Sequence, residues 1–353
     1  MDRHGETHLF NPYLKGGKPM KKVVLTIFLI FVLLAGTAAA ADPIELKFAI
    51  MGPAQQAPVV KCFRPWGDKL EAASEGAVKF NVYAGGTLGR DPRVQYKIVA
   101  DGVADMAFVV PLYTTGRFPD DEIFAIPLTA KKGMEFSKAS HGLFKKGLLS
   151  GYDDVVVLAH FATEVNYIHS TYPVRVPADL KGHKFRTSNN FHASFFKSVG
   201  ATGVGMPSPK VAENMSRGII HGTIHDNSAI FTFGIAKVAK YHLLVPMGGN
   251  ALAVIMNKKK YQSLPDVARK AIDELGEELV ECWVKAIQWD IEKGMKNLKK
   301  DPAHKIVTPT AAEMKLWEDA LYPQIDQWVA KVPKRASLLK AYKAELERIR
   351  AGN

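Results

Sequence analysis

Cysteines and catalytic motifs are scarce in this sequence of 353 residues. The chain has two cysteines, Cys62 and Cys282, and no C-x-x-C pair. Secretion would permit one disulfide, but two isolated and widely separated cysteines are more typical of buried thiols. No G-x-S-x-G sequence occurs, which excludes a nucleophile elbow, and no pair of carboxylates stands out as an acid–base couple. We therefore expect a protein that is not an enzyme and that needs no cofactor.

Two further patterns look like ligand motifs but do not fit them. The segment GATGVG (200–205) is rich in glycine but lacks the G-x-G-x-x-G spacing and follows a predicted helix, so we expect a helix C-terminal turn. His221 and His225 are four residues apart, which on a helix would place two metal ligands on one face. Gly222 and the neighbouring isoleucines favour a strand, so no metal site is predicted.

Long apolar runs are absent after the first 41 residues. The run from Val23 to Leu34 follows Lys21 and Lys22, and small residues offering A-x-A cleavage sites come directly after it. The run is shorter than the roughly 20 residues that span a bilayer, and the layout is that of a secretory signal peptide. We expect residues 1–41 to be a leader and signal peptide and the mature chain to be exported.

The composition is that of an ordinary globular protein with an excess of positive charge. The chain is 47% hydrophobic and 23% charged, which suffices for two domains with hydrophobic cores. The formal charge is +12, and residues 1–41 contribute five basic and two acidic side chains, which leaves about +9 on the rest. No basic run with interleaved aromatics occurs. The charge suits anionic solutes better than nucleic acid, and we expect no nucleic-acid partner.

Strand and helix patterns alternate along most of the chain. Between residues 44 and 110 the order is strand, helix, strand, helix, strand, which predicts an α/β domain with a largely parallel sheet. A second α/β series begins near VNYIHS (165–170), and the chain returns to a strand at ALAVIMN (251–257). Residues 264–300 form one long helical pattern on the order of 50 Å, long enough to cross between two domains.

Arg186 is the candidate ligand residue. It ends the polar stretch DLKGHKFRT (179–187), at the end of a predicted strand, and short polar side chains follow it. A surface ion pair is the commonest fate of an arginine. A guanidinium, however, matches a carboxylate with two parallel hydrogen bonds, and a buried organic anion needs such a partner.

Several motifs in order resemble the solute receptors of tripartite ATP-independent periplasmic (TRAP) transporters, a family that includes dicarboxylate and sialic acid receptors. The resemblance covers residues 42 to about 330 and rests on IELKFAI, VYAGGTLGRD, DGVADMAFV, VRVPADLKGHKFRT, VGATGVGMPSPKVAENMSRGIIHG and KKKYQSLPD.

The resemblance implies a two-lobed α/β fold, the periplasmic binding protein type II fold with hinge strands and a long interdomain helix. It implies that lobe I comprises residues 42–163 plus 252–292 and that lobe II comprises 164–251 plus 293–353. It also implies a periplasmic receptor that delivers a small organic acid anion to TRAP membrane subunits, with a monomer as the default state. Two alternatives stay open: a receptor that presents its ligand to a sensor kinase, and a secreted enzyme on a similar scaffold.

In the family, the arginine that ends DLKG-x-K-x-R clamps the substrate carboxylate, and this role carries over to Arg186. The charged positions of other members fall here on Ile224, His225, Asn166 and Val110, so the pocket is expected to be less charged. We expect a monocarboxylate with an apolar or aromatic body. The predicted ligand-binding residues are Arg186, Asn166, His225, Ser188, Asn190, Met206, Tyr113, Phe191 and Trp66, of which the aromatic ones are more often core residues than ligand contacts.

Overall fold

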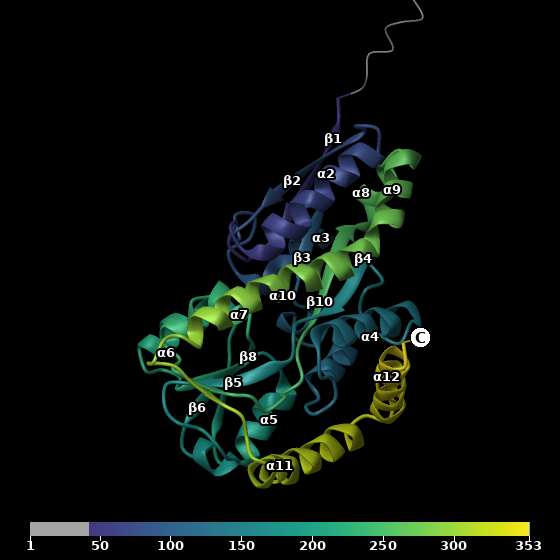
Figure 1. Ribbon diagram of the computed structural model, residues 1–353. Coiled ribbons are helices and arrows are strands. Elements are labelled where there is room, and N and C mark those ends of the chain that lie inside the picture. The colour runs from purple at the N-terminus through teal and green to yellow at the C-terminus, as the bar shows by residue number, and fades with distance from the viewer. Residues whose placement is uncertain (1–41, 353) are drawn as a thin grey trace, which may run out of the picture. The chain divides into compact units, whose positions relative to one another are not determined.

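The computed structural model describes residues 42–352. The described residues from Pro43 onward belong to one compact unit, which contains two β-sheets (Figure 1). The predicted signal peptide lies outside the described residues. None of the helices within residues 42–352 is both long and apolar enough to cross a membrane.

The first sheet has five strands in the order β2-β1-β3-β10-β4. Strand β1 pairs in parallel with β2 and β3, whereas β10 runs antiparallel to both of its neighbours, β3 and β4. The predicted strand–helix–strand succession is confirmed over residues 44–109. The strands are β1 (Ile44–Ala49), β2 (Val78–Tyr83), β3 (Met106–Val109), β4 (Val155–Ala162) and β10 (Ala251–Asn257).

Helices cover both faces of the first sheet, which explains why β10 reads as an unbroken apolar run. Leu252, Val254 and Met256 point to one face, toward helices α2, α9 and α10. The alternate residues pack on the other face, toward α3, α4 and α12. The helices are α2 (Arg64–Ala73), α3 (Gln95–Ala100), α4 (Gly133–Lys145), α8 (Lys258–Ser263), α9 (Asp266–Gly276), α10 (Glu278–Leu298) and α12 (Lys334–Arg350).

The second sheet has six strands in the order β11-β9-β5-β8-β6-β7. Its core on one face contains Ile168, Phe185 and Ile224, packed against α5 and α11, and α6 and α7 lie against the other face. The elements are β5 (Asn166–Ser170), β6 (Lys184–Thr187), α5 (Asn190–Ser198), β7 (Thr202–Gly205), α6 (Val211–Ser216), β8 (Gly222–Asp226), α7 (Ala229–Thr232), β9 (Tyr241–Leu243), β11 (Lys305–Val307) and α11 (Ala311–Ala330).

The glycine-rich segment 200–205 is only partly the turn that the sequence predicts. Gly200 has a φ of +76° directly after α5, as expected for a helix C-terminal turn. The rest of the segment forms β7, which pairs in parallel with β6 at the edge of the sheet. The expectation of a plain turn is therefore wrong for residues 202–205.

The long helical pattern is interrupted once. Helix α9 ends at Gly276 and α10 begins at Glu278, so the prediction of one continuous helix is wrong at this point. A Cβ atom at position 276 would lie 2.8 Å from the carbonyl oxygen of Leu158 in β4. Glycine thus lets the helical segment approach the strand more closely than any other residue would.

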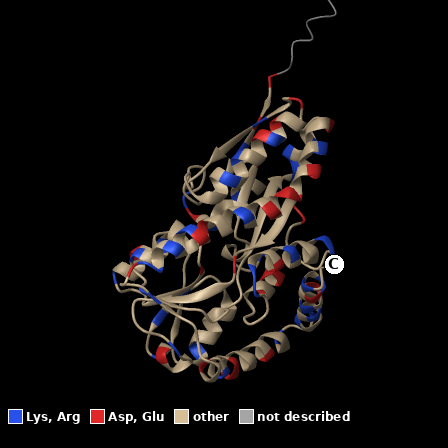
Figure 2. Cartoon of the chain, in the orientation of Figure 1, with Lys and Arg blue, Asp and Glu red and all other residues tan. Residues whose placement is uncertain are grey.

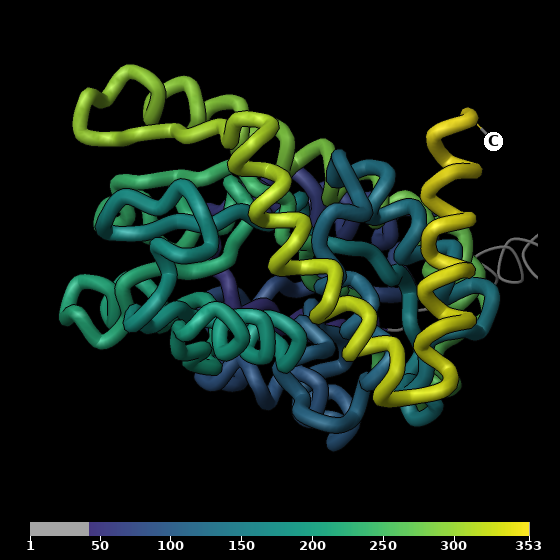
Figure 3. The backbone as a smooth tube through the Cα atoms, turned by 90° about the horizontal axis from the view of Figure 1, so that it is seen from below, coloured from purple at the N-terminus to yellow at the C-terminus, as the bar shows by residue number. Residues whose placement is uncertain are grey.

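Two helices connect the cores on the two sheets. Helix α10 contributes Trp283 to the core of the first sheet and Leu298 to the core beside α6 and α7. Helix α11 contributes Trp317 to the core of the second sheet and Trp328 to a core of the first. Figure 3 shows this helix running obliquely across the molecule before the chain turns into α12. The sequence predicted one helix that crosses between the two domains. In the structure both α10 and α11 connect the cores of the two sheets.

The division of the chain into lobes stays a prediction, but contacts of α12 bear on its boundary. Leu338, Tyr342 and Leu346 pack into the core that contains α4 and β10. We therefore assign residues 334–350 to the first sheet, although the sequence suggested the second lobe for them. Figure 2 shows that basic and acidic residues are interspersed along helices α10, α11 and α12.

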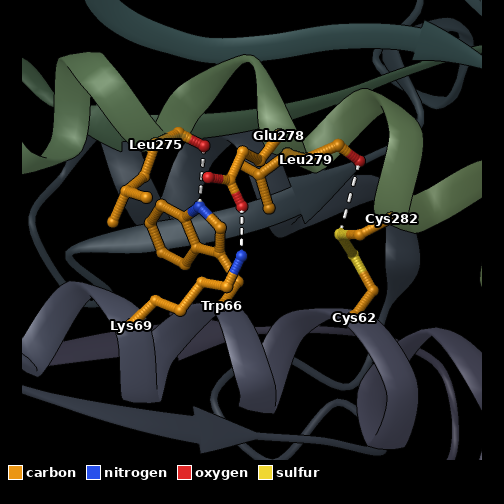
Figure 4. The surroundings of a disulfide bond; sticks show 7 residues. All are labelled: Cys62, Trp66, Lys69, Leu275, Glu278, Leu279 and Cys282. Atoms are coloured by element: carbon orange, nitrogen blue, oxygen red, sulfur yellow. Dashed lines mark hydrogen bonds and ion pairs between the residues drawn. A yellow bond between two sulfur atoms is a disulfide. The ribbon is translucent and has the colours of Figure 1, made fainter.

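A disulfide joins Cys62 to Cys282, so the expectation of two free buried thiols is wrong (Figure 4). Cys62 lies in a helical turn of the π type, Val59–Phe63, and Cys282 lies in α10. The Cα atoms are 5.1 Å apart although 220 residues separate the cysteines in sequence. Lys69 of α2 and Glu278 of α10 form an ion pair near the disulfide, so α10 is linked covalently to the turn before α2 and by charge to α2 itself.

We expect removal of this disulfide to destabilise the protein without unfolding it. The double substitution Cys62→Ser and Cys282→Ser should lower the free energy of unfolding by about 2–5 kcal/mol, because the bond no longer restricts the unfolded chain. Chemical denaturation with and without a reductant measures this. The reductant should affect the wild type and leave the double variant unchanged. A wild type that gives two titratable thiols under oxidising conditions would contradict the bond.

A line of buried histidines crosses the second sheet. His169 Nδ1 lies 2.9 Å from His242 Nδ1, and His242 Nε2 lies 2.9 Å from His304 Nδ1. His169 Nε2 donates to the carbonyl of His225 at 3.0 Å. Burial lowers the pKa of His169 to about 4, and burial, with the neighbouring histidines, lowers the pKa of His242 to about 2. These rings are therefore neutral at pH 7.

We expect the stability of the protein to fall on acidification below pH 6.5. In the unfolded chain these histidines have a pKa of about 6.5, so they become protonated between pH 7 and pH 5, whereas in the folded protein they stay neutral. The unfolded state therefore binds more protons, and the free energy of unfolding decreases by several kcal/mol over this range. Urea unfolding at a series of pH values measures the slope. His242→Asn should reduce it by about one proton.

Two carboxylates oppose this trend. Burial raises the pKa of Asp226 to about 6, so its protonation stabilises the folded state as the pH falls from 6 toward 4. Burial also raises the pKa of Glu164, which acts in the same direction. These two groups are outnumbered by the buried histidines. A stability that stays constant or increases from pH 7 to pH 5 would show that the histidines are not buried in neutral form.

Candidate functional site

A cavity lies between the two sheets and is lined by residues from both. Its volume is about 80 Å³, which suits a compact occupant. From the first sheet, Phe108 lies in β3, Val110 directly follows β3, and Leu252 lies in β10. From the second sheet, His225 and Asp226 lie in β8. The cavity therefore lies where a movement of one sheet relative to the other would open or close it.

Arg186 lies directly behind the wall of this cavity. Its side chain is 0% exposed, and its guanidinium is held by groups from several elements. Nη2 donates to the Tyr113 hydroxyl at 3.0 Å, Nη1 lies 3.0 Å from His225 Nε2, and Nε donates to the Met206 carbonyl at 2.8 Å. Tyr113 and His225 line the cavity, so the guanidinium is separated from it by one layer of side chains.

The charge of Arg186 has no carboxylate partner among residues 42–352. No ion pair involves it, and its hydrogen-bond acceptors there are hydroxyl, imidazole and carbonyl groups. Burial lowers the pKa of the Arg186 guanidinium, which reflects the cost of a buried charge. An anion that reached it would compensate this charge, so the site is electrostatically prepared for an acid.

His225 is the second polar group at this point. Its Nδ1 lies 2.7 Å from the Thr223 hydroxyl, and its Nε2 lies 2.8 Å from the Ser208 hydroxyl. Burial and the charge of Arg186 hold the pKa of His225 well below its usual range. A neutral ring with Nε2 as acceptor from Arg186 and Nδ1–H as donor to Thr223 satisfies this network.

Two carboxylates also line the cavity. Asp226 is 6% exposed and its Oδ1 accepts hydrogen bonds of 2.9 Å from the backbone N–H groups of Ser228 and Ala229. Glu164 follows β4, and its Oε2 accepts from the N–H of Gly133 at 2.9 Å. Burial raises the pKa of Glu164, and the charge of Asp226 adds to the shift.

Most of the remaining wall is apolar and aromatic. The rings of Phe108 and Trp283 are stacked, with centroids 5.0 Å apart and an angle of 27° between the planes. Both line the cavity, and the Trp283 indole N–H donates to the carbonyl of Ala162 at 3.3 Å. Other apolar lining residues are Met51, Pro58, Val110, Ala229, Phe233, Leu252 and Ile287.

The structure places the predicted ligand-binding residues at different points. Tyr113 and His225 line the cavity, and Arg186 contacts both. Ser188, Asn190 and Met206 line a second hollow, which shares Tyr113 with the first. Ser188 nevertheless reaches the first cavity indirectly, because its hydroxyl donates to Asn250, a lining residue, at 2.7 Å.

Three predicted ligand residues lie elsewhere, and for these the expectation needs correction. Trp66 is 3% exposed and packs in the core of the first sheet, where its indole N–H donates to the Leu275 carbonyl (Figure 4). Phe191 packs in the core that contains α4. Asn166 is 1% exposed, does not line the cavity, and has no hydrogen-bond partner for its side-chain amide.

Several lining residues were not found from the sequence. Phe108 and Trp283 are 175 positions apart and read as core residues, so no local pattern brings them together. Glu164 and Asp226 are single acids at strand ends without a motif. Val110 lines the cavity, as the resemblance suggested, whereas Ile224 is a core residue that offers only its carbonyl to Arg186.

A metal centre finds no support in the described part of the chain. No group of three or more His, Cys, Asp or Glu side chains there is arranged to hold a metal ion. His221, one of the two histidines weighed as a metal pair, accepts a hydrogen bond from the N–H of Lys184.

Comparisons with known proteins agree with this geometry. The family model "Bacterial extracellular solute-binding protein, family 7" (DctP) matches residues 50–331. The 2,3-diketo-L-gulonate-binding periplasmic protein YiaO of Escherichia coli K12 is 26% identical over 283 residues, 79% of this chain and 85% of YiaO. The C4-dicarboxylate-binding periplasmic protein DctP of Rhodobacter capsulatus is 24% identical over 312 residues, 87% of this chain and 93% of that protein.

Solved structures show the same similarity. A TRAP solute-binding protein from an unidentified marine microbe, described as specific for aromatic acid ligands and crystallised with 3-hydroxybenzoate, superposes with a TM-score of 0.81. It is 26% identical, and the match covers 87% of this chain and 99% of that one. With a family match that spans both sheets and the cavity between them, this chain belongs to the TRAP solute-binding proteins, family 7 of the bacterial extracellular solute-binding proteins.

Proposed function

We propose that this chain is a periplasmic receptor that binds a small monocarboxylate with an aromatic body and delivers it to a TRAP membrane transporter. On this proposal residues 1–41 are removed on export, the receptor acts as a monomer, and no chemical step occurs on the bound acid. Membership of family 7 supports the receptor role. The aromatic acid specificity of the marine relative supports the ligand class.

The observation that carries the proposal is the buried guanidinium of Arg186 without a carboxylate partner in residues 42–352. A carboxylate that enters the cavity and displaces the His225 contact would form charge-assisted hydrogen bonds with it. The stacked rings of Phe108 and Trp283 would then lie against the body of the acid. Arginine fixes one end of the ligand and the aromatic wall selects the other.

Closure of the two lobes is the mechanism by which a loaded receptor would differ from an empty one. Tyr113 follows β3 of the first sheet, and its hydroxyl accepts a hydrogen bond from Arg186 of the second sheet and one of 3.0 Å from the Ser208 N–H. These contacts join the two sheets across the cavity. A ligand that bridges the same groups would favour the closed form, which a membrane partner is expected to recognise.

Loss of the Arg186 charge should abolish tight binding. We expect Arg186→Met to weaken binding of benzoate or 3-hydroxybenzoate by at least about tenfold, because a hydrogen bond to a charged group contributes roughly 1.5–3 kcal/mol. Isothermal titration calorimetry measures the affinity, after a thermal-shift screen with succinate and glucuronate as further probes.

Arg175→Met provides the matched control, because Arg175 pairs with Glu313 on the surface and does not line the cavity. It should bind like the wild type. If Arg186→Met binds within threefold of the wild type, Arg186 is not the carboxylate partner.

Removal of the Tyr113 hydroxyl should weaken the closed form. We expect Tyr113→Phe to reduce affinity about three- to tenfold, mainly through faster dissociation, because two hydrogen bonds between the sheets are lost. Stopped-flow fluorescence measures the two rate constants. Tyr172→Phe is the control, because that hydroxyl donates to Asp179 within the region of the second sheet. An unchanged dissociation rate in Tyr113→Phe would exclude this closing contact.

A further inference from the structure

Two acids in the cavity are left without a role by the proposed carboxylate site. Glu164 and Asp226 both line the cavity, and neither forms an ion pair with a lysine, arginine or histidine in the described chain. Asp226 is satisfied at Oδ1 by two backbone N–H groups, and Glu164 is satisfied at Oε2 by one. The backbone of Val165 also forms a hydrogen bond with the Glu164 carboxylate, so both acids are held by backbone groups and neither has a cation beside it.

The three ionisable groups of this region follow an order. Asp226 directly follows His225, whose Nε2 lies 3.0 Å from Arg186 Nη1. Asp226 also pairs with Asn166 across β5 and β8, and Glu164 lies two residues before Asn166. Asp226 thus lies between the other two, and Glu164 lies toward the N-terminus of α4. Asp290 adds a further acid behind this row, since its Oδ2 accepts from the Ser228 hydroxyl at 2.9 Å.

These positions make the two ends of the cavity chemically different. A negative charge is compensated at the Arg186 end and repelled at the Glu164 end. Two partly buried carboxylates that lack a cation gain most from a ligand group that donates a hydrogen bond. A second carboxylate on the ligand would instead face like charges in a site of low polarity.

We propose that Glu164, together with Asp226, accepts a hydrogen bond from a donor group at the end of the aromatic acid opposite its carboxylate. The same two acids would prevent aromatic diacids from binding. This inference rests on the proposed function, because it takes the ligand carboxylate to lie at Arg186. The donor is a hydroxyl or amino group on the ring. Glu164 is thereby a specificity-determining residue, and the receptor is selective for hydroxylated or aminated aromatic monocarboxylates.

The test compares ligands that differ in one ring substituent. 3-Hydroxybenzoate and 3-aminobenzoate carry a donor, 3-chlorobenzoate is similar in size but has no donor, and isophthalate carries a second carboxylate; the 4-substituted series repeats the comparison. We expect the wild type to prefer the donor-bearing acid of one series by about tenfold over its chloro analogue. Isophthalate and terephthalate should not bind measurably.

Glu164→Gln isolates the charge, because the amide oxygen can still accept from the Gly133 N–H. We expect this variant to lose the preference for the hydroxyl or amino group and to gain affinity for the matching diacid at least about tenfold, since one repulsive charge is removed. Asp226→Asn should shift both preferences in the same direction. Glu213→Gln, which removes an exposed acid paired with Arg217 on α6, should behave like the wild type.

The outcomes separate this inference from the proposed function. If the wild type binds the chloro and hydroxy acids equally, or if Glu164→Gln keeps the wild-type order of ligands, the inference is wrong although the receptor function stands. The ligand comparison in the wild type decides this even where a variant does not fold. If no aromatic monocarboxylate binds and Arg186→Met changes nothing, the proposed function itself is wrong.

Discussion

The burial of one guanidinium without a carboxylate partner is the constraint on which the site depends. Arg186 is placed by β6, the strand next to β8, so His225 and the Ile224 carbonyl lie within its reach. Every acceptor in direct contact with it is neutral, so among the described residues its charge is compensated only at longer range, by Asp226. The neutral form of His225 is a consequence of this, since a second positive charge at 3.0 Å would be repelled.

The hydrogen-bond acceptors of the Arg186 guanidinium come from elements far apart in sequence. Tyr113 approaches from the end of β3, Ser208 from the segment before α6, and Met206 from the end of β7. Tyr113 is the acceptor that comes from the first sheet, so this hydrogen bond of the guanidinium forms only when the two sheets are in contact. The local geometry of the site is therefore coupled to the relative position of the sheets, which is the property that a receptor requires.

The sequence predicted those features that local patterns encode. The strands, the principal helices and the position of Arg186 at a strand end follow from periodicity and from one continuous motif. Trp66 was misjudged because a tryptophan is amphipathic, and only the structure reveals that the Leu275 carbonyl takes its N–H. Phe108 and Trp283 could not be paired from the sequence, because their contact depends on the return of the chain through α10. The close approach of Gly276 to Leu158 was likewise hidden, because more than a hundred residues separate the two in sequence.

The position of β10 between β3 and β4 has a consequence for how the chain folds. Both neighbours precede β10 by many residues, and the strands β5 to β9 of the second sheet are made before it. As the chain is synthesised from its N-terminus, β3 and β4 therefore each keep an open edge until residues 251–257 arrive. Strands β5 to β9 of the second sheet can pair during this interval, whereas the first sheet is completed only by the late insertion of β10, and β11 joins the second sheet later still. Slow, non-local completion of this kind is the stage at which the folding chain is most exposed to aggregation.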